Sequence, residues 1–149
     1  MPITNDPRDA RLREVDPKTG LQAAYLVLSD EECAKGFVRP YRDEYVHVGA
    51  RPKFEVRDLT AEEHERYDQF GYVKYEGYPE GEGCLGKFWT QAQLESGCGT
   101  TTTMGEQIAA TYARDPEYYG ATYCCHCQKH FPVGEDGEFE WLDGSKVGA

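Results

Sequence analysis

The sequence lacks any run of about 18 apolar residues, and its first twenty residues, MPITNDPRDARLREVDPKTG, are predominantly polar. We therefore expect neither a membrane-spanning helix nor a secretion signal. This predicts a cytoplasmic protein, in which thiols stay reduced. The six cysteines are accordingly expected to be free or bound to a metal ion rather than paired in disulfides.

Several sequence signatures of catalysis are also missing. There is no GxxxxGK[ST] loop, no GxGxxG after a predicted strand and no Gly-x-Ser-x-Gly elbow. Nucleobase deaminases need His-x-Glu upstream of Cys-x-x-Cys, whereas the upstream histidines read His47-Val-Gly and His64-Glu-Arg. The zincin signature His-Glu-x-x-His fails because Asp68 occupies its last place. We expect no catalytic residues and a protein that is not an enzyme.

Positive charge is scarce in the C-terminal three-fifths of the chain. Residues 61–149 carry 6 Lys and Arg against 16 Asp and Glu, whereas residues 1–60 carry 10 against 11. The net charge of −11 repels phosphates and membranes and favours a protein partner with a basic surface. We therefore expect no membrane partner and no nucleic-acid partner.

One basic stretch supports nucleic-acid binding as the alternative function. Six cations between residues 35 and 57 are interleaved with aromatic side chains, a pattern that can contact phosphates and stack bases. These cations are Lys35, Arg39, Arg42, Arg51, Lys53 and Arg57. Asp43, Glu44, Glu55 and the adjacent Asp58 dilute the pattern, so it stays the alternative.

Length and composition predict one globular domain. A chain of 149 residues with 39% hydrophobic residues can bury a core. We expect a flexible arm at residues 1–20 and a single α+β domain at residues 21–149, which includes a zinc-binding segment at residues 98–130. In this fold, short helices pack on a small, mostly antiparallel sheet.

Three helix starts carry the capping-box pattern, in which a hydroxyl and a Glu or Gln three residues later bind each other's backbone amides. The pairs are Ser29 with Glu32, Thr60 with Glu63, and Thr90 with Gln93. A glycine follows each start within a few residues and ends the helix. Short helices are therefore predicted near residues 30–35, 61–69 and 91–96.

A fourth helix and several strands complete the expected elements. After the threonine run TTTT, Met104, Ile108 and Tyr112 recur at a four-residue spacing, and Pro116 ends the helix. The segments FVRPYRDEYVHVG, GYVKYEGY and ATYC are rich in β-branched and aromatic residues and indicate strands. The C-terminal GEFEWLDGSKVG predicts two short strands around a turn.

Cysteine and histidine are concentrated in one stretch, YCCHCQKHF, at residues 123–131. Its Cys-Cys-His-Cys resembles the Trp-Cys-Gly-His-Cys of protein disulfide isomerases, but only 22 residues follow Cys127, too few to complete a thioredoxin fold. Thiol oxidoreductase activity is therefore the less favoured alternative. Cys124 and Cys127 instead have the spacing of a zinc knuckle, in which two thiolates bind one ion. Buried free thiols are the third interpretation.

A tetrahedral zinc site needs two ligands besides Cys124 and Cys127. His130 lies three residues beyond Cys127, and Cys98 lies in a Gly-Cys-Gly turn whose glycines let the backbone approach a metal. We expect a closed, structural Zn²⁺ site formed by Cys98, Cys124, Cys127 and His130. The alternatives for one of these places are Cys84, Cys125 and His126.

A resemblance extends beyond these motifs. The run GCGTTTTMGEQIAATYARDPEYYGATYCCHCQKHFPVGEDGEFEWLDGSKVG, with KGFVRPYRDEYVHVG upstream, resembles a group of small bacteriophage and prophage proteins of unassigned function. The resemblance implies a phage accessory protein that acts in the cytoplasm of a bacterial host and carries a Cys/His cluster of the zinc type. Accessory proteins of this kind frequently inhibit host systems. The expected function is therefore stoichiometric binding of a host or phage protein, as by an acidic anti-CRISPR-like inhibitor.

Overall fold

The computed structural model describes residues 2–149, and these form two compact units. The first unit contains the chain up to Val48 and again from Cys98 to Ala149, and the second unit is Gly49–Gly97. The second unit is thus inserted into the sequence of the first. The sequence predicted one domain over residues 21–149, because its length and composition are those of a single globular domain.

The N-terminal residues belong to the first unit. Strand β1 (Ile3–Thr4) pairs in parallel with β2 (Tyr25–Leu26), and the 3₁₀ helix η1 (Ala10–Arg13) lies between them in the sequence. The Tyr123 hydroxyl donates a hydrogen bond to the carbonyl of Thr19. The stretch expected to be an arm therefore contains regular elements and contacts the rest of its unit.

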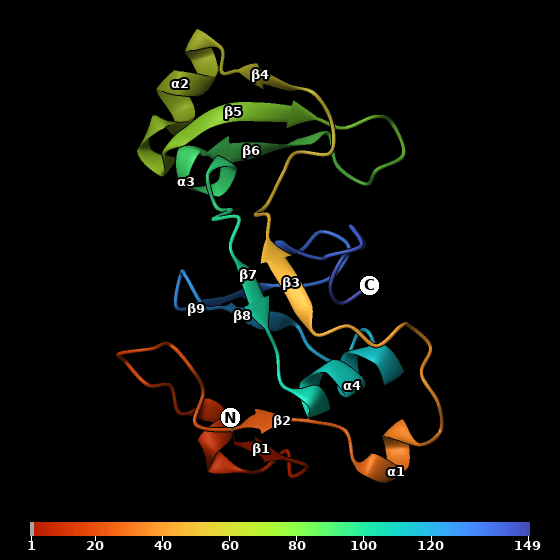
Figure 1. The fold of residues 1–149 in the computed structure, drawn as a ribbon. Coiled ribbons are helices and arrows are strands. Elements are labelled where there is room, and N and C mark those ends of the chain that lie inside the picture. Colours follow the sequence, from red (N-terminus) through yellow and green to blue (C-terminus); the bar gives the residue numbers. More distant parts are fainter. Residues whose placement is uncertain (1) are drawn as a thin grey trace. The chain divides into compact units, whose positions relative to one another are not determined.

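A three-stranded antiparallel sheet forms the centre of the first unit (Figure 1). Strand β3 (Glu44–His47) lies between β7 (Thr101–Thr103) and β10 (Phe139–Trp141). Strands β8 (Ala121–Cys124) and β9 (Lys129–Pro132) form a separate antiparallel hairpin. Two helices complete the unit: α1 (Asp30–Cys33) and α4 (Glu106–Arg114).

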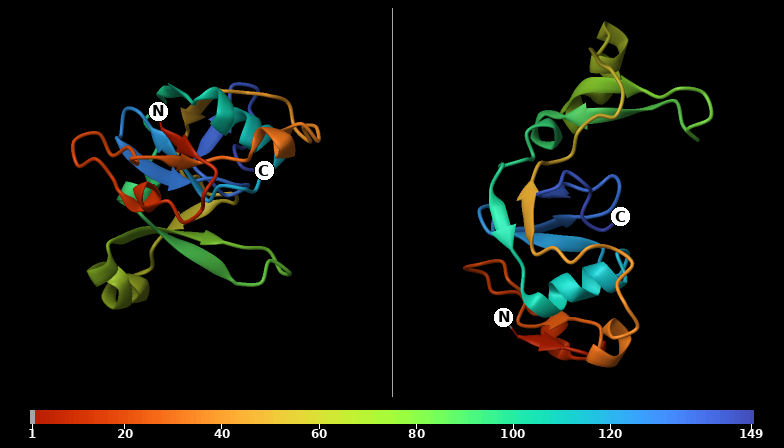
Figure 2. Two further views of the ribbon diagram at one scale, coloured as in Figure 1. Left: turned by 90° about the horizontal axis from the view of Figure 1, so that it is seen from below. Right: turned by 45° about the vertical axis from the view of Figure 1, so that its right-hand side comes forward.

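The core of the first unit lies between α4 and the sheet. Helix α4 buries Ile108 and Tyr112 on one face, and Figure 2 shows it lying between the N-terminal strands and β7. The Tyr112 ring meets Trp141 edge to face at 5.6 Å, and Tyr45 meets Phe139 edge to face at 5.3 Å. Such aromatic pairs each contribute about 0.5–1.5 kcal/mol beyond the burial of their area.

The second unit has its own antiparallel sheet, in the order β4 (Val56–Asp58), β5 (Tyr72–Gly77), β6 (Gly86–Thr90). Its short helices are α2 (Ala61–Tyr67), η2 (Asp68–Phe70) and α3 (Gln91–Leu94). The Glu76 carboxylate is buried and accepts hydrogen bonds from the Trp89 indole, at 3.0 Å, and from the Phe54 amide, at 2.7 Å. The indole N–H of Trp89 and the backbone N–H of Phe54 therefore both have a hydrogen-bond acceptor.

The predicted α+β class is confirmed, with β1 and β2 as the parallel pair among otherwise antiparallel ones. Thr60 and Thr90 form complete capping boxes, and Ser29 accepts from the Glu32 amide. Within the threonine run, Thr101–Thr103 form β7, and α4 begins only after Gly105. No helix in residues 2–149 has the length and apolar character needed to cross a bilayer.

The capping box of α2 makes the stability of this helix depend on pH. A hydrogen bond from Arg57, followed by one from the Thr60 amide, lowers the pKa of Glu63 from 4.5 to about 2. Because the folded-state pKa lies below the ordinary value, this stabilisation is fully present above about pH 4.5 and is lost as the pH falls through 2.

We expect a carboxyl-carbon NMR titration to give Glu63 a midpoint of about 2. The variant Arg57→Met should move the midpoint towards 4.5. The control Arg66→Met removes an arginine of α2 that pairs with Glu62, and it should leave the midpoint of Glu63 in place. A midpoint near 4.5 in the unmodified protein would show that the Arg57 contact does not form.

Candidate metal centre

Four side chains of the first unit bring potential metal ligands together: His47, Cys98, Cys124 and Cys127. One ring nitrogen and three sulfur atoms lie within 4.8 Å of one another. His47 and Cys124 are fully buried, and Cys98 and Cys127 are partly buried. This group could hold a metal ion.

The shortest separations match the edges of a tetrahedral site. Zinc bonds of about 2.3 Å to sulfur and about 2.0–2.1 Å to nitrogen require edges of about 3.8 Å between two sulfurs and about 3.6 Å between sulfur and nitrogen. The Sγ atoms of Cys98 and Cys124 are 3.5 Å apart, and Cys127 Sγ lies 3.5 Å from His47 Nδ1. Only small shifts would be needed to place all four atoms around one ion.

Backbone pairing beside β3 places His47 next to Cys98. The Gly99 amide donates to the His47 carbonyl at 2.9 Å, and the His47 amide donates to the Thr100 carbonyl at 3.2 Å. These two bonds extend the ladder between β3 and β7 towards Cys98. Gly99 has a φ of +74°, a conformation that glycine adopts without strain. The Gly-Cys-Gly turn therefore positions the Cys98 thiol at the end of β3.

The hairpin of β8 and β9 supplies the other two thiols. Cys124 is the last residue of β8, and Cys127 lies in the turn that follows. The Gln128 amide closes this turn by donating to the Cys124 carbonyl at 2.9 Å. The backbone amides of Cys127 and His126 donate to the sulfur of Cys124. The Cys-x-x-Cys turn thus presents two sulfur atoms that could bind one metal ion.

The His47 ring is held by two aromatic side chains and by a contact at its second nitrogen. It stacks on Phe131 with ring centroids 4.4 Å apart and lies 4.9 Å from Phe139. Its Nε2 is 3.0 Å from Oε1 of Glu138, a side chain that is only 13% exposed. A carboxylate behind a metal-binding histidine fixes the ring orientation and makes the other nitrogen a better ligand. Nδ1 is therefore presented to the three sulfurs.

Burial and hydrogen bonds set the pKa values of the three thiols. At Cys98 burial opposes ionisation, but hydrogen bonds from the Thr100 amide and hydroxyl and from Cys124 and His47 outweigh it and lower the pKa to about 6. Burial raises the pKa of Cys124. Burial and the neighbouring thiols raise the pKa of Cys127 to about 12. The cluster by itself thus favours a single thiolate, whereas a divalent cation stabilises all three.

The group contains three of the four predicted ligands, and its histidine differs. His130 lies outside the group, with its Nε2 2.9 Å from the Tyr25 hydroxyl. In the hairpin His130 pairs with Tyr123, whereas Cys124 pairs with Lys129. Since successive side chains of a strand point to opposite faces, His130 lies on the face opposite Cys124.

The three alternative ligands also lie outside the group. Cys84 belongs to an exposed turn of the second unit. The Cys125 amide donates to the Thr102 hydroxyl at 3.1 Å, and this hydroxyl donates to the Cys125 sulfur at 3.3 Å, so the thiol lies beside β7. His126 is exposed. His47, which lies 51 positions before Cys98, was not among the ligands predicted from the sequence. One feature of the sequence could have indicated it: His47 lies between two valines in a predicted strand. Burying a charged imidazole there is energetically unfavourable unless the ring has a binding partner.

Comparisons with protein families, with curated proteins and with solved structures found no match to this chain. The chemistry of the centre therefore has to be deduced from its geometry.

The two histidines give a direct test of the ligand set. His47→Ala removes one of the four ligands, so it should weaken binding of a divalent metal by at least about 100-fold. This loss exceeds the usual effect of removing a residue that only hydrogen-bonds to a ligand. Glu138→Ala removes such a residue and should weaken binding by about 10- to 100-fold. His130→Ala should leave the affinity within about threefold.

Competition of each purified variant with a chromophoric chelator measures these affinities. Circular dichroism of the metal-loaded proteins controls for loss of the fold. The opposite ranking, with His130→Ala severe and His47→Ala mild, would restore the ligand set predicted from the sequence.

Proposed function

We propose that the chain is a zinc-stabilised binding protein, in which the four-residue centre holds one structural Zn²⁺ and the metal performs no catalysis. The proposal rests on the chemical identity of the four ligand atoms. Three sulfurs and one imidazole nitrogen fill all four positions of a tetrahedral ion. Structural zinc sites are closed in this way, whereas catalytic sites keep a position for water or substrate.

The donor atoms favour zinc over the other common cations. Calcium and magnesium prefer six or more oxygen ligands, and this group offers none. Thiolates select zinc, copper(I) or iron–sulfur clusters, and an S₃N set in a compact tetrahedron is typical of zinc.

A zinc ion here would join three parts of the first unit. The end of β3, the segment that begins at Cys98 and the β8–β9 hairpin each contribute at least one ligand. In zinc-finger peptides the binding of a structural ion supplies about 10–16 kcal/mol of apparent free energy, and that binding energy is folding energy. The ion would stabilise a unit whose strands are only two to four residues long.

The thiols do not suit a redox enzyme. A catalytic Cys-x-x-Cys exposes its attacking sulfur at an electropositive site. The first cysteine of the pair, Cys124, is 0% exposed. An external disulfide would therefore have no access to its sulfur.

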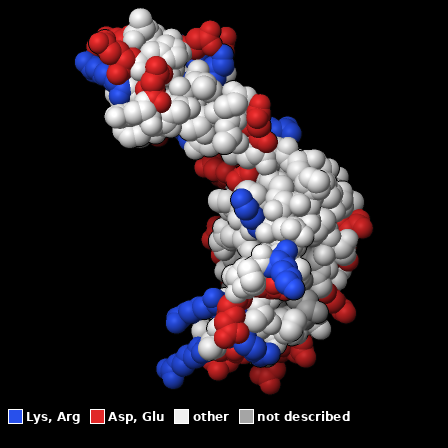
Figure 3. Space-filling view, turned by 90° about the vertical axis from the view of Figure 1, so that its left-hand side faces the viewer, with Lys and Arg blue, Asp and Glu red and all other residues white. Residues whose placement is uncertain are grey.

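The proposed partner is a protein with a basic surface. Residues 98–149 carry 3 Lys and Arg against 8 Asp and Glu, which favours association with a basic surface. On the face shown in Figure 3, acidic and basic residues are interspersed, so the proposal rests on the charge balance and not on a single acidic patch. In the phage setting that the sequence resemblance implies, a host defence protein is the corresponding class of partner.

The alternative, nucleic-acid binding, has less support. Of the six cations expected to form a footprint, three lie in each unit. Three of them pair with an acidic residue of their own unit, and the first is Lys35, which lies 2.8 Å from Glu32. Arg42 lies over the Trp141 ring at 4.8 Å and pairs with Asp143, and Arg57 lies over Tyr75 at 4.5 Å and pairs with Glu63.

Elemental analysis of protein purified without added metal should find about one zinc per chain. X-ray absorption should give three sulfur ligands and one nitrogen, without a bound water. Because zinc binding is coupled to folding, a chelator should abolish hydrogen-exchange protection in β3, β7 and β8 and spare β5 and β6. A zinc-free protein with intact protection in β3 would refute the structural role, and a bound water would indicate a catalytic site.

Charge reversal tests the proposed partner. Affinity capture from a bacterial lysate should yield a protein that, once purified, binds in a 1:1 complex and weakens about tenfold between low and physiological salt. Glu117→Lys with Glu135→Lys should weaken this complex more than the matched pair Glu14→Lys with Glu31→Lys. All four side chains belong to exposed residues, and Glu138 is left unchanged because it supports His47. Equal effects of the two pairs would show that net charge alone governs binding.

A further inference from the structure

The first unit contains a cavity of about 190 Å³ that is separate from the four-residue metal group. It lies among α4, the start of β8, β7 and the segment that leads into β2. None of the residues around it is Asp, Glu, Lys, Arg or His. The cavity is therefore without charge on every side.

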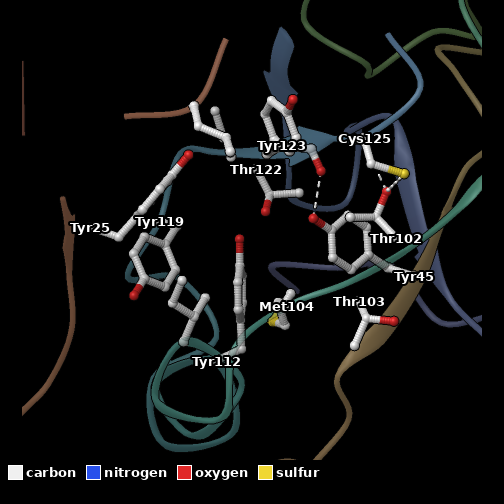
Figure 4. Close-up of a pocket in the computed structure, with 13 residues that line it drawn as sticks. Tyr25, Tyr45, Thr102, Thr103, Met104, Tyr112, Tyr119, Thr122, Tyr123 and Cys125 are labelled. Carbon is white, nitrogen blue, oxygen red and sulfur yellow. Dashed lines mark hydrogen bonds between the residues drawn. The ribbon is translucent and has the colours of Figure 1, made fainter. Parts of the chain in front are cut away.

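Aromatic rings form much of its wall (Figure 4). They belong to Tyr25, Tyr45, Tyr112, Tyr119 and Tyr123. Aliphatic side chains, among them Leu21 and Ile108, fill the space between the rings. A wall of this composition favours a flat, apolar ligand, because aromatic rings pack well against one another.

Four of the five tyrosine hydroxyls have protein partners. Tyr45 donates to the Tyr123 carbonyl at 2.5 Å, and Tyr119 donates to the Leu26 carbonyl at 2.5 Å. The Tyr123 hydroxyl donates to Thr19, and the Tyr25 hydroxyl contacts the Gln22 amide and His130. These bonds hold the four rings in place around the cavity.

The fifth hydroxyl, that of Tyr112, makes no hydrogen bond of ordinary length among residues 2–149, although the residue is only 3% exposed and the Thr122 side chain interacts weakly with it. Figure 4 shows the Tyr112 ring extending from α4 between Tyr119 and Tyr45, with its hydroxyl directed into the cavity. Burial raises the pKa of Tyr112, so this hydroxyl keeps its proton and can donate. An unpaired buried hydroxyl is unfavourable, and a ligand with an acceptor atom would satisfy it.

We propose that this cavity binds a neutral compound with one aromatic ring and one hydroxyl or carbonyl group. The volume fits such a ligand, because an apolar cavity of about 150 Å³ holds benzene and the remaining space accommodates a substituent. The uncharged wall excludes an ionised ligand, which would lose its hydration without gaining a partner. The polar substituent accepts the hydrogen bond of Tyr112.

Met104 offers a local probe of binding. It lines the cavity and is one of only two methionines in the chain, the other being Met1. In protein labelled with ¹³C at the methionine methyl groups, phenol should shift the Met104 signal in a saturable way, through the ring current of the bound ligand.

Four small probes separate the alternatives. We expect phenol to bind most tightly and toluene, which lacks the hydroxyl, to bind about fivefold more weakly. Benzoate and benzyltrimethylammonium, which carry opposite charges, should give no saturable shift. Tighter binding of benzyltrimethylammonium would overturn the proposal in favour of an aromatic cage for cations.

Tyr112→Phe removes the free hydroxyl and little else. It should weaken phenol about fivefold and leave toluene within about twofold, so that the preference between them disappears. Tyr118→Phe, at a tyrosine outside the cavity wall, is the matched control and should bind both probes as the unmodified protein does. An unchanged preference for phenol in Tyr112→Phe would overturn the assigned hydrogen bond.

Leu21→Trp tests the location by filling the cavity from its edge. Leu21 is partly buried, and the larger side chain should abolish the Met104 shift with both neutral probes. An unchanged dispersion of the remaining NMR signals controls for folding. If no neutral probe shifts Met104 in the unmodified protein at millimolar concentration, the cavity is a packing defect and the proposal fails.

Discussion

The position of β3 in the middle of its sheet determines both the metal group and the cavity of the first unit. Strand β3 is hydrogen-bonded to β7 on one side and to β10 on the other. Tyr45 and His47 are two residues apart, so both point to the same face, where one lines the cavity and the other meets the three thiols. A slip of one residue in this register would turn both side chains away from the core.

Local signals in the sequence were sufficient for much of this fold. The capping boxes at Thr60 and Thr90 formed, because a hydroxyl and a Glu or Gln three residues later need only the backbone of one turn. The approach of Cys124 and Cys127 is also local, since a single hairpin turn brings their two sulfurs together. The α+β class followed from these short-range patterns together with the β-branched and aromatic residues of the segments near residues 72 and 121.

The histidine of the metal group depends on contacts that no local pattern contains. His130 is close to Cys127 in the sequence, but the register of the β8–β9 hairpin places it beside Tyr123. His47 reaches the thiols through pairing of β3 with residues 99–100, which follow the inserted unit, and with Phe139 of β10. Whether a nearby or a distant histidine faces the thiols is decided by strand register, which depends on the packing of the whole unit.

The insertion of the second unit between His47 and Cys98 has a mechanical consequence. Any tension on Gly49–Gly97 reaches the first unit through two chain segments, and each begins beside one of these ligands. A bound ion would connect the two segments through His47 and Cys98. A pulling force on the inserted unit would therefore act on the metal–ligand bonds before it acted on the hydrogen bonds between β3 and β7. The two attachment points would keep their spacing while the inserted residues were stretched, unfolded or replaced by another sequence.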